Sequence, residues 1–323
     1  MTVLWNSIQS VLVVVLIMIL GYVLRRTGWF DDKFAGTISK FIKNIALPAS
    51  IFVSVLGRLT RGQLASFAGY LAYAFIAVII GYLIAFALVK IMKIRPGRKG
   101  IFVNAIVNAN TIFIGLPLNM ALFGEKSMTY FLVYYVVNTV STWAFGVFLI
   151  SNDDPTKPKE KTHNKIDWKK VIPMPLVGFL VALVFLLLNV NPTKISFIGS
   201  TLTYVGNLVT PLSLIYIGIV LADAGLKSIR FDRDTVVALI GRFILSPIIM
   251  IAVLMVVGNL GVQMPSLASQ TLIVQSATPM LAVLPILANE AHGDVEYATN
   301  VVTTSTVLFI VVVPVLMTLI QYI

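Results

Sequence analysis

The sequence lacks cysteine altogether and has few charged residues for its length. The absence of cysteine excludes disulfides, thiolate metal sites and cysteine nucleophiles, and two histidines argue against a multi-histidine metal centre. Charged residues make up 11% of the 323 positions and hydrophobic residues 58%, whereas a soluble domain carries about 25% charged residues. A water-soluble domain is therefore excluded, and so is disorder, which needs low hydrophobicity. What remains is a polytopic membrane protein.

The net charge of +11 does not indicate nucleic acid as a partner. The basic residues lie in short loops between apolar runs, which is how lysine and arginine set membrane topology. The first apolar stretch, Val11–Leu24, has no basic segment before it and ends at Arg25 and Arg26. We therefore expect a retained first helix and not a cleaved signal peptide.

Apolar runs of about 20 residues, the length that crosses a bilayer, recur along the chain. We predict an all-α membrane protein with ten transmembrane helices, because lipid-exposed backbone must satisfy its polar groups internally and no barrel-like alternation is present. The predicted segments are Val3–Leu24, Ala35–Leu56, Leu64–Met92, Ile101–Phe123, Met128–Ile150, Val171–Val190, Phe197–Ala222, Thr235–Leu260, Leu267–Asn289 and Val295–Tyr322.

Basic residues are distributed unequally between the two sets of loops. The loops after even-numbered segments hold Arg58, Arg61, Lys126 and Lys194. The loops after odd-numbered segments hold seventeen: Arg25, Arg26, Lys33, Lys90, Lys93, Arg95, Arg98, Lys99, Lys157, Lys159, Lys161, Lys165, Lys169, Lys170, Lys227, Arg230 and Arg233. By the positive-inside rule both termini face outside a cell membrane. The long polar stretch Ser151–Lys170 is then a flexible cytoplasmic linker.

The two halves on either side of this linker, residues 1–150 and 171–323, show weak internal similarity. Each half has five segments, so the second half would insert upside down relative to the first. Three short stretches match in the same order: Leu47–Phe52 with Thr210–Ile215, Gly115–Leu118 with Val283–Ile286, and Val136–Thr139 with Val301–Thr304. Inverted repeats of this kind are typical of secondary transporters.

Polar and small residues gather in the fourth predicted segment. They are Asn104, Asn108, Asn110, Thr111, Gly115, Pro117 and Asn119. Helical spacing places several on one stripe, which must face a cavity or another helix because an amide in lipid is costly. Pro117 lacks an amide hydrogen and Gly115 loosens the helix, so we predict a break there, close to mid-membrane.

The ninth segment repeats this design, with Gln275, Ser276, Thr278, Pro279 and Pro285. Paired breaks free backbone groups that attract an anion, typically a carboxylate, and mark a transporter's substrate site. A single proline in a membrane helix is explained more simply as a kink. Two segments with the same arrangement of prolines and polar residues favour a binding site. The polar residues Asn138, Thr142, Asn300 and Thr303 either line the substrate path or hold helices together.

No Asp or Glu lies deep within any predicted segment. We therefore predict no catalytic residue, no metal site and no cofactor, and we disfavour a proton relay through a midplane carboxylate. A neutral cage of amide, hydroxyl and carbonyl groups could still hold sodium. Arg242 is the one cation well inside a segment, and we expect its side chain to extend to the cytoplasmic surface. The minority interpretation makes it a partner for a second substrate carboxylate.

The run Asn108–Pro117, the proline in the second segment and the ten-segment inverted halves together resemble the auxin efflux carrier family. The short central loop points to its bacterial branch of malate or malonate permeases. The resemblance implies a scaffold domain of helices 1, 2, 6 and 7, a transport domain of helices 3–5 and 8–10, crossing of helices 4 and 9 at their prolines, a homodimer through the scaffold, and an elevator-like motion. An asparagine near the first break would hold the substrate carboxylate. A similar fold occurs in bile-acid sodium symporters.

The sequence thus predicts a secondary transporter for a small organic anion, with malate-like dicarboxylates favoured. The alternatives are an auxin-like weak-acid exporter, a sodium-coupled organic-anion symporter, a passive anion channel and a membrane receptor. A membrane-embedded enzyme is disfavoured because the predicted midplane lacks acid–base and metal-binding residues.

Overall fold

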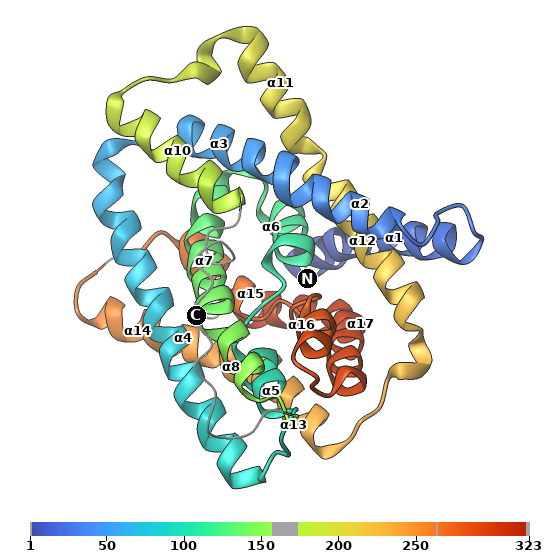
Figure 1. Ribbon diagram of the computed structural model, residues 1–323. Helices are drawn as coiled ribbons and strands as arrows, with labels where there is room; N and C mark the ends of the chain where they lie inside the picture. Colours follow the sequence, from blue (N-terminus) through green and yellow to red (C-terminus); the bar gives the residue numbers. More distant parts are fainter. Residues whose placement is uncertain (1, 157–173, 263, 321–323) are drawn as a thin grey trace.

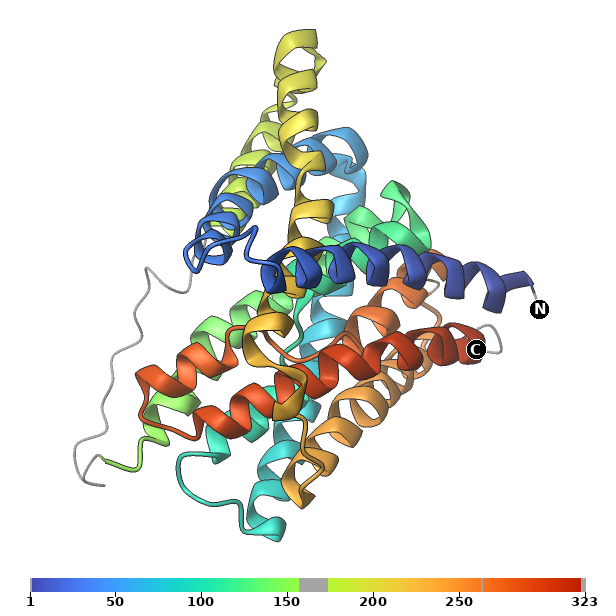
Figure 2. The same ribbon diagram turned by 90° about the vertical axis from the view of Figure 1, so that its right-hand side faces the viewer.

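The computed structural model describes residues 2–156, 174–262 and 264–320, which form helices joined by short turns (Figures 1 and 2). These ranges contain no strand, and one isolated bridge joins Ala109 to Met280. The predicted all-α class is confirmed. The start of the sixth predicted segment, the end of the tenth and the linker beyond Thr156, with its six lysines, lie outside the described residues.

The helices follow one another along the chain in the order seen in Figure 1. The first half contains α1 Thr2–Arg26, α2 Phe34–Phe41, η1 Ile42–Ala46, α3 Leu47–Arg58, η2 Arg61–Gln63, α4 Leu64–Met92, α5 Lys99–Val107, η3 Thr111–Gly115, α6 Leu116–Phe123, η4 Glu125–Ser127, α7 Met128–Val140, η5 Ser141–Gly146 and α8 Val147–Asn152. The second contains α10 Met174–Leu188, η6 Pro192–Lys194, α11 Ser196–Asn207, α12 Val209–Ala224, η7 Leu226–Ser228, α13 Arg233–Ile240, η8 Gly241–Leu245, α14 Ser246–Asn259, α15 Ser266–Ser276, α16 Leu284–Glu290 and α17 Val295–Leu319.

Every predicted segment contains helix. Within the described ranges, seven helical stretches are long and apolar enough to cross a membrane, and Thr111–Phe123 and Met174–Leu188 are shorter apolar helices. The fourth and ninth predicted segments differ from the rest because runs of at least three non-helical residues, 108–110 and 277–283, divide each into two short helices. The protein is thus a polytopic membrane protein with two interrupted segments.

One group of helices consists of α1–α3 and α10–α12, in which α1 packs on α12 and α3 packs on α10 and α11 (Figure 1). Glycines permit these close contacts. A Cβ atom on Gly218 would collide with the α1 backbone at Met18, and one on Gly21 would collide with the α12 backbone at Ile215. Without a hydrophobic driving force between helices in lipid, such small-residue contacts allow the dispersion attraction that holds membrane helices together.

The second group contains α4–α8 and α13–α17 and encloses most of the buried core. Every residue of α5 from Gly100 to Val107 is buried, because α4, α8, α13 and α16 pack around it. The two groups meet where α1 packs along α17 and where α12 contacts η3 and α6 (Figure 2). The interrupted segments therefore lie in the second group and contact the first.

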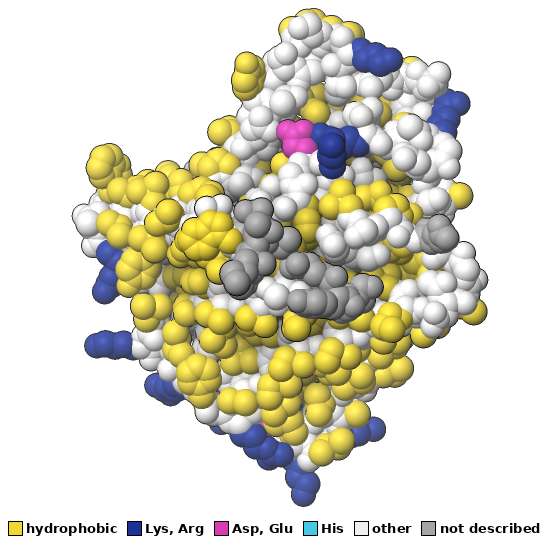
Figure 3. Space-filling model, turned by 180° about the vertical axis from the view of Figure 1, so that it is seen from behind, with side chains coloured by type: hydrophobic (Ala, Val, Ile, Leu, Met, Phe, Trp, Pro, Cys, Tyr) yellow, Lys and Arg dark blue, Asp and Glu magenta, His cyan; other side chains and the backbone are white. Residues whose placement is uncertain are grey.

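Large apolar side chains cover much of the outer surface. In the view from behind, hydrophobic side chains form a broad area and most of the Lys and Arg side chains lie towards its margins (Figure 3). Exposed residues include Leu83, Ile91, Phe197 and Leu260, each at least 65% exposed. Apolar side chains exposed this extensively need lipid as their solvent.

Ion pairs gather in the loops, most densely around Arg98 between α4 and α5. Its guanidinium lies 2.9 Å from Asp234 and 2.8 Å from Asp294 and packs over the ring of Tyr297. Burial raises the pKa of Asp294, but hydrogen bonds from Arg95, the Tyr297 amide and Arg98 outweigh it, so the net pKa is lowered. These bonds tie the starts of α5, α13 and α17 together.

Candidate functional site

The two interrupted segments cross at their breaks. α5 ends at Val107 and α15 ends at Ser276, and the non-helical residues that follow meet in an antiparallel bridge between Ala109 and Met280. The Asn110 amide donates to the Pro279 carbonyl at 2.8 Å. Each break thus supplies the other with part of the hydrogen bonding that a continuous helix would have provided.

The first break lies earlier than predicted. Gly115 and Pro117 do not interrupt the helix; the non-helical residues are Asn108–Asn110. Pro117 lies inside the continuous helical stretch Thr111–Phe123, directly after the π-helical residues Thr111–Gly115, whose wider turn accommodates a residue without an amide hydrogen. Pro285 is the second residue of α16, while Pro279 lies within the second break as predicted.

Asn138 of α7 forms hydrogen bonds with the backbone of the first break. Its side-chain oxygen accepts from the Ala109 amide at 2.8 Å, and its side-chain nitrogen donates to the Ala109 carbonyl at 2.9 Å. The side chain therefore pairs with Ala109 as a neighbouring strand would. A weaker contact at 3.4 Å reaches the Thr111 hydroxyl.

A buried polar chain leads away from the same break. The Asn104 side chain donates to the Gly100 and Gly146 carbonyls, and its oxygen accepts from Asn108 at 2.7 Å. The Ser141 hydroxyl donates to Asn108 at 2.6 Å, and Asn108 in turn donates to the Tyr82 hydroxyl at 3.2 Å. Tyr82 and Ser141 were not predicted from the sequence, although Ser141 directly precedes the predicted residue Thr142.

Gln275 joins α15 to the second half of the other segment. Its amide nitrogen donates to the Gly115 carbonyl at 2.9 Å, and a Cβ atom on Gly115 would collide with its amide oxygen. That oxygen is buried without a hydrogen-bond partner, and so is the side-chain nitrogen of Asn110. The crossing therefore holds one free donor and one free acceptor on neighbouring segments.

The remaining hydroxyl groups predicted at the second break bond to their own helix end. Thr278 donates to the Gln275 carbonyl at 2.8 Å, and Ser276 donates to the Ile273 carbonyl at 2.6 Å. Both side chains are buried, as is Thr111 at the first break. They stabilise the breaks locally.

Other predicted residues do not gather at the crossing. Asn119 donates to Ser127 at 2.7 Å near the loop between α6 and α7. Asn300 pairs with both backbone groups of Arg230 at 2.8 Å each, next to the start of α13. Thr142 and Thr303 are buried side chains on η5 and α17.

The expectation that the Arg242 side chain extends to the surface is wrong. Its side chain is 0% exposed and donates to the Ile106 carbonyl at 3.1 Å and to the Ser276 carbonyl. Those carbonyls lie at the carboxyl ends of α5 and α15, where helix dipoles concentrate negative potential. Two converging helix ends attract the guanidinium more strongly than the distant surface does.

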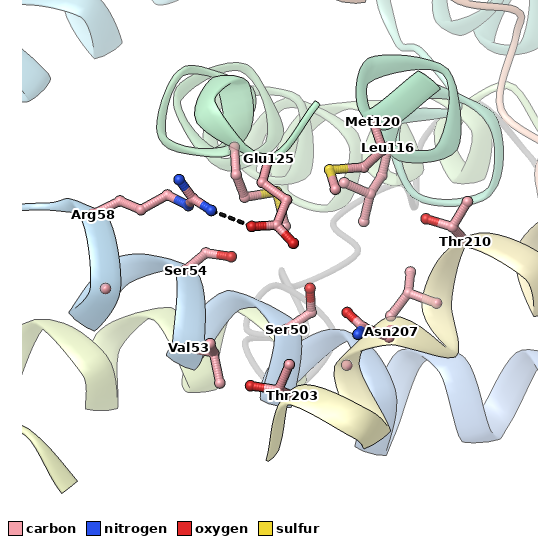
Figure 4. Close-up of a pocket in the computed structure, with 14 residues that line it drawn as sticks. Ser50, Val53, Ser54, Arg58, Leu116, Met120, Glu125, Thr203, Asn207 and Thr210 are labelled. Carbon is pink, nitrogen blue, oxygen red and sulfur yellow. Dashed lines mark hydrogen bonds and ion pairs between the residues drawn. The ribbon is translucent and has the colours of Figure 1, made fainter. Parts of the chain in front are cut away.

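A cavity of about 420 Å³ adjoins the half-helix α6 (Figure 4). Polar side chains of α3, α11 and α12 form one side, and Leu116 and Met120 of α6 form the other. The polar and charged lining residues are Ser50, Ser54, Arg58, Glu125, Thr203, Asn207 and Thr210. Figure 4 shows the ion pair between Arg58 and Glu125 at one side of this cavity. Sequence analysis did not name these residues as site residues, although Ser50 and Thr210 lie in the matching stretches of the two halves.

The crossing is built from neutral polar groups and one arginine, with no Asp, Glu or His at the breaks. Among the described residues, each Asp and Glu lies in a loop or in a terminal turn of a helix, and no three His, Asp or Glu side chains gather into a metal site. A multi-pass helical protein in which two broken helices cross has the architecture of a membrane transporter.

Comparison with known proteins identifies the family within the membrane transporters. The model of the family described as "Membrane transport protein" matches residues 6–317, so the chain belongs to this family, that of the auxin efflux carriers. It is 25% identical over 314 residues to an "Uncharacterized transporter" of Methanothermobacter thermautotrophicus, covering 96% of this chain and 97% of the relative. An "Uncharacterized transporter" of Methanocaldococcus jannaschii is 25% identical over 305 residues, covering 94% and 95%.

Proposed function

We propose that the protein is a secondary carrier for a small organic anion and that the crossing of the broken helices binds its carboxylate. The unpartnered side-chain nitrogen of Asn110 supports this proposal most directly. Asn110 caps η3 by accepting from the Phe113 amide at 3.2 Å, which leaves its NH₂ group to donate. The amino end of η3 and α6 adds positive potential at the same place.

The unpartnered side-chain oxygen of Gln275 indicates that the substrate carries a hydrogen-bond donor as well as a carboxylate. The Gln275 oxygen has no partner and its nitrogen is held by Gly115, so the amide cannot turn to present a donor without losing that bond. A substrate hydroxyl would satisfy the oxygen while its carboxylate accepted from Asn110. A hydroxy acid of malate type therefore fits better than an unsubstituted dicarboxylate, because a site that holds a hydroxyl disfavours analogues lacking it.

The packing supports an elevator-like cycle. If the two halves are repeats, the sixth predicted segment corresponds to the first, and the seventh to the second. The contact of the first segment with the seventh (α1 with α12) then has a counterpart in the contact of the sixth with the second (α10 with α3), and both pairs pack closely. We assign α1–α3 and α10–α12 to a scaffold that forms a homodimer, and α4–α8 and α13–α17 to the moving domain. The halves 1–150 and 171–323 are then inverted repeats joined by the cytoplasmic linker 151–170.

The cavity in Figure 4 then lies between scaffold and moving domain, on the outer side of a cell membrane with both termini outside. It provides the substrate's entrance, and the crossing beyond it is closed in this conformation because Asn108, Asn110 and Gln275 are all buried. An entrance that ends at a closed site favours alternating access over a passive channel. It also favours transport over a receptor role.

Uptake of labelled malate into proteoliposomes tests the proposal. Asn110→Leu should lower uptake about 10- to 100-fold, the value of one hydrogen bond to a charged group. Asn289→Leu, the same change at an exposed position of α16, should not. Malate should compete about tenfold better than succinate in the wild type and equally in Gln275→Leu. Normal uptake by Asn110→Leu would contradict the proposed site.

A further inference from the structure

Arg242 is the largest fully buried side chain of the described residues. It is nine residues into the helical stretch Arg233–Asn259, about 13 Å along the axis. None of the described carboxylates forms an ion pair with it, and its Nε atom has no partner. A buried charge must be balanced in some other way.

The balance comes from the two breaks. In a continuous helix the Ile106 carbonyl would accept from the Asn110 amide, but that amide donates to Pro279. The Ser276 carbonyl would likewise accept from the Met280 amide, which instead donates to the Ser305 hydroxyl at 3.2 Å. Both carbonyls are therefore released by the breaks, and Arg242 donates to both.

The partial negative charges of the two helix ends balance the positive charge of the Arg242 guanidinium. Each helix carboxyl end carries about half an elementary negative charge, so two ends offset about one guanidinium. The Ser246 hydroxyl also donates to the Ile106 carbonyl, at 2.9 Å. Gly241 lets the helix approach, because a Cβ atom there would lie 2.6 Å from the Ile106 side chain.

We propose that Arg242 is a tethered cation of the crossing, which occupies the place where carriers with discontinuous helices bind a coupling sodium ion. Carbonyls at half-helix carboxyl ends are the groups that coordinate sodium in such carriers. Here the covalently attached guanidinium satisfies them throughout the transport cycle. Arg242 is thus a positioning residue: it holds α5 and α15 together, and the crossing needs no sodium. This assignment depends on the proposed carrier function only where uptake is measured. The measurements of unfolding do not depend on it.

The first test measures thermal unfolding of the purified protein in sodium and in choline buffers, which needs no substrate. The wild type should unfold at the same temperature in both buffers. In choline, Arg242→Ala should unfold about 5–10 °C below the wild type, because removing one partner of a buried charge arrangement is strongly destabilising. Saturable stabilisation of the wild type by sodium would overturn the proposal.

Rescue by free guanidinium separates a cation site from general destabilisation. Millimolar guanidinium should raise the unfolding temperature of Arg242→Ala by mass action and restore part of its uptake. Arg61→Ala is the matched control, because Arg61 also donates to carbonyls at a helix end, Leu186 and Leu187 of α10, but at the exposed surface. Equal responses of the two variants to guanidinium would overturn the proposal.

Two further variants keep the test decisive if Arg242→Ala does not fold. Arg242→Lys retains a positive charge and should keep uptake within about tenfold of the wild type, whereas Arg242→Met has similar length without charge and should lose it. Equal stability and uptake of the lysine and methionine variants would show that the charge is not needed. If no organic acid is transported by the wild type, the carrier proposal fails while the unfolding measurements still decide the role of Arg242.

Discussion

Replacing Asn138 by leucine should separate the stability of the protein from the geometry of its crossing. Leucine has the same number and branching of side-chain heavy atoms as asparagine, so the substitution removes hydrogen bonds without leaving a cavity. The Ala109 amide would lose its partner at 2.8 Å and become an unsatisfied buried donor. The Ala109 carbonyl would lose the bond at 2.9 Å but keep the Thr111 amide, which also donates to it at 2.9 Å.

The magnitude follows from these bonds. An orphaned buried amide costs about 1–3 kcal/mol, and the loss of one of two bonds to the carbonyl adds about 1 kcal/mol. The total of about 2–4 kcal/mol corresponds to a fall of about 3–6 °C in the unfolding temperature of a chain of this length. Uptake should fall further than stability explains, because the freed segment at Ala109 precedes the capping residue Asn110.

Asn300→Leu provides the control, because Asn300 makes the same paired bonds to both backbone groups of Arg230, away from the crossing. Both variants should unfold at similarly lowered temperatures. Measured well below those temperatures, uptake should be lost in Asn138→Leu and kept in Asn300→Leu. The reasoning is refuted if Asn138→Leu unfolds at the wild-type temperature, or if both variants lose uptake equally.

Two more predictions concern other parts of the structure. Gly146→Ala should lower uptake about tenfold, because the added methyl group would collide with the Asn104 side chain and displace Asn108; unchanged uptake and unchanged unfolding would contradict this. The pKa of Asp294 is lowered from its usual 3.8, so its stabilising effect is present above that pH and is lost as the pH falls through the lowered value. The unfolding temperature of Asp294→Asn should therefore lie below that of the wild type near pH 7 and approach it in acid; a difference that does not shrink would exclude the charge of Asp294 as its cause.

The helical architecture could be predicted from the sequence because it follows from local properties. Apolar runs of bilayer length and the exclusion of strands from lipid require only composition and spacing. The break was misplaced because proline and glycine, which mark interruptions in a sequence, are also accommodated within a helix at a π-helical turn. Asn108–Asn110 leaves the helical conformation where the Asn110 amide bonds to Pro279, a partner in the other half that no local pattern reveals.

The candidate site was predicted in part. Asn108, Asn110 and Gln275 stood out because an amide facing lipid is costly, and the structure buries all three at the crossing. The burial of Arg242 could not be predicted, because its position near a helix start is equally compatible with a side chain that reaches the surface. The lining of the cavity was missed because small polar residues on α3 and α11 are indistinguishable in sequence from residues that pack helices together.

The hydrogen-bond balance of the crossing links these findings. Breaking two helices frees carbonyl groups at one pair of ends and amide groups at the other. The freed carbonyls of Ile106 and Ser276 are satisfied by Arg242 within the protein. On the other side, Asn110 is left with a donor to spare. The freed carbonyls are already paired, whereas the Asn110 side-chain nitrogen and the Gln275 side-chain oxygen are not. A hydroxy acid can satisfy both, its carboxylate accepting from Asn110 and its hydroxyl donating to Gln275, whereas a cation cannot accept from Asn110.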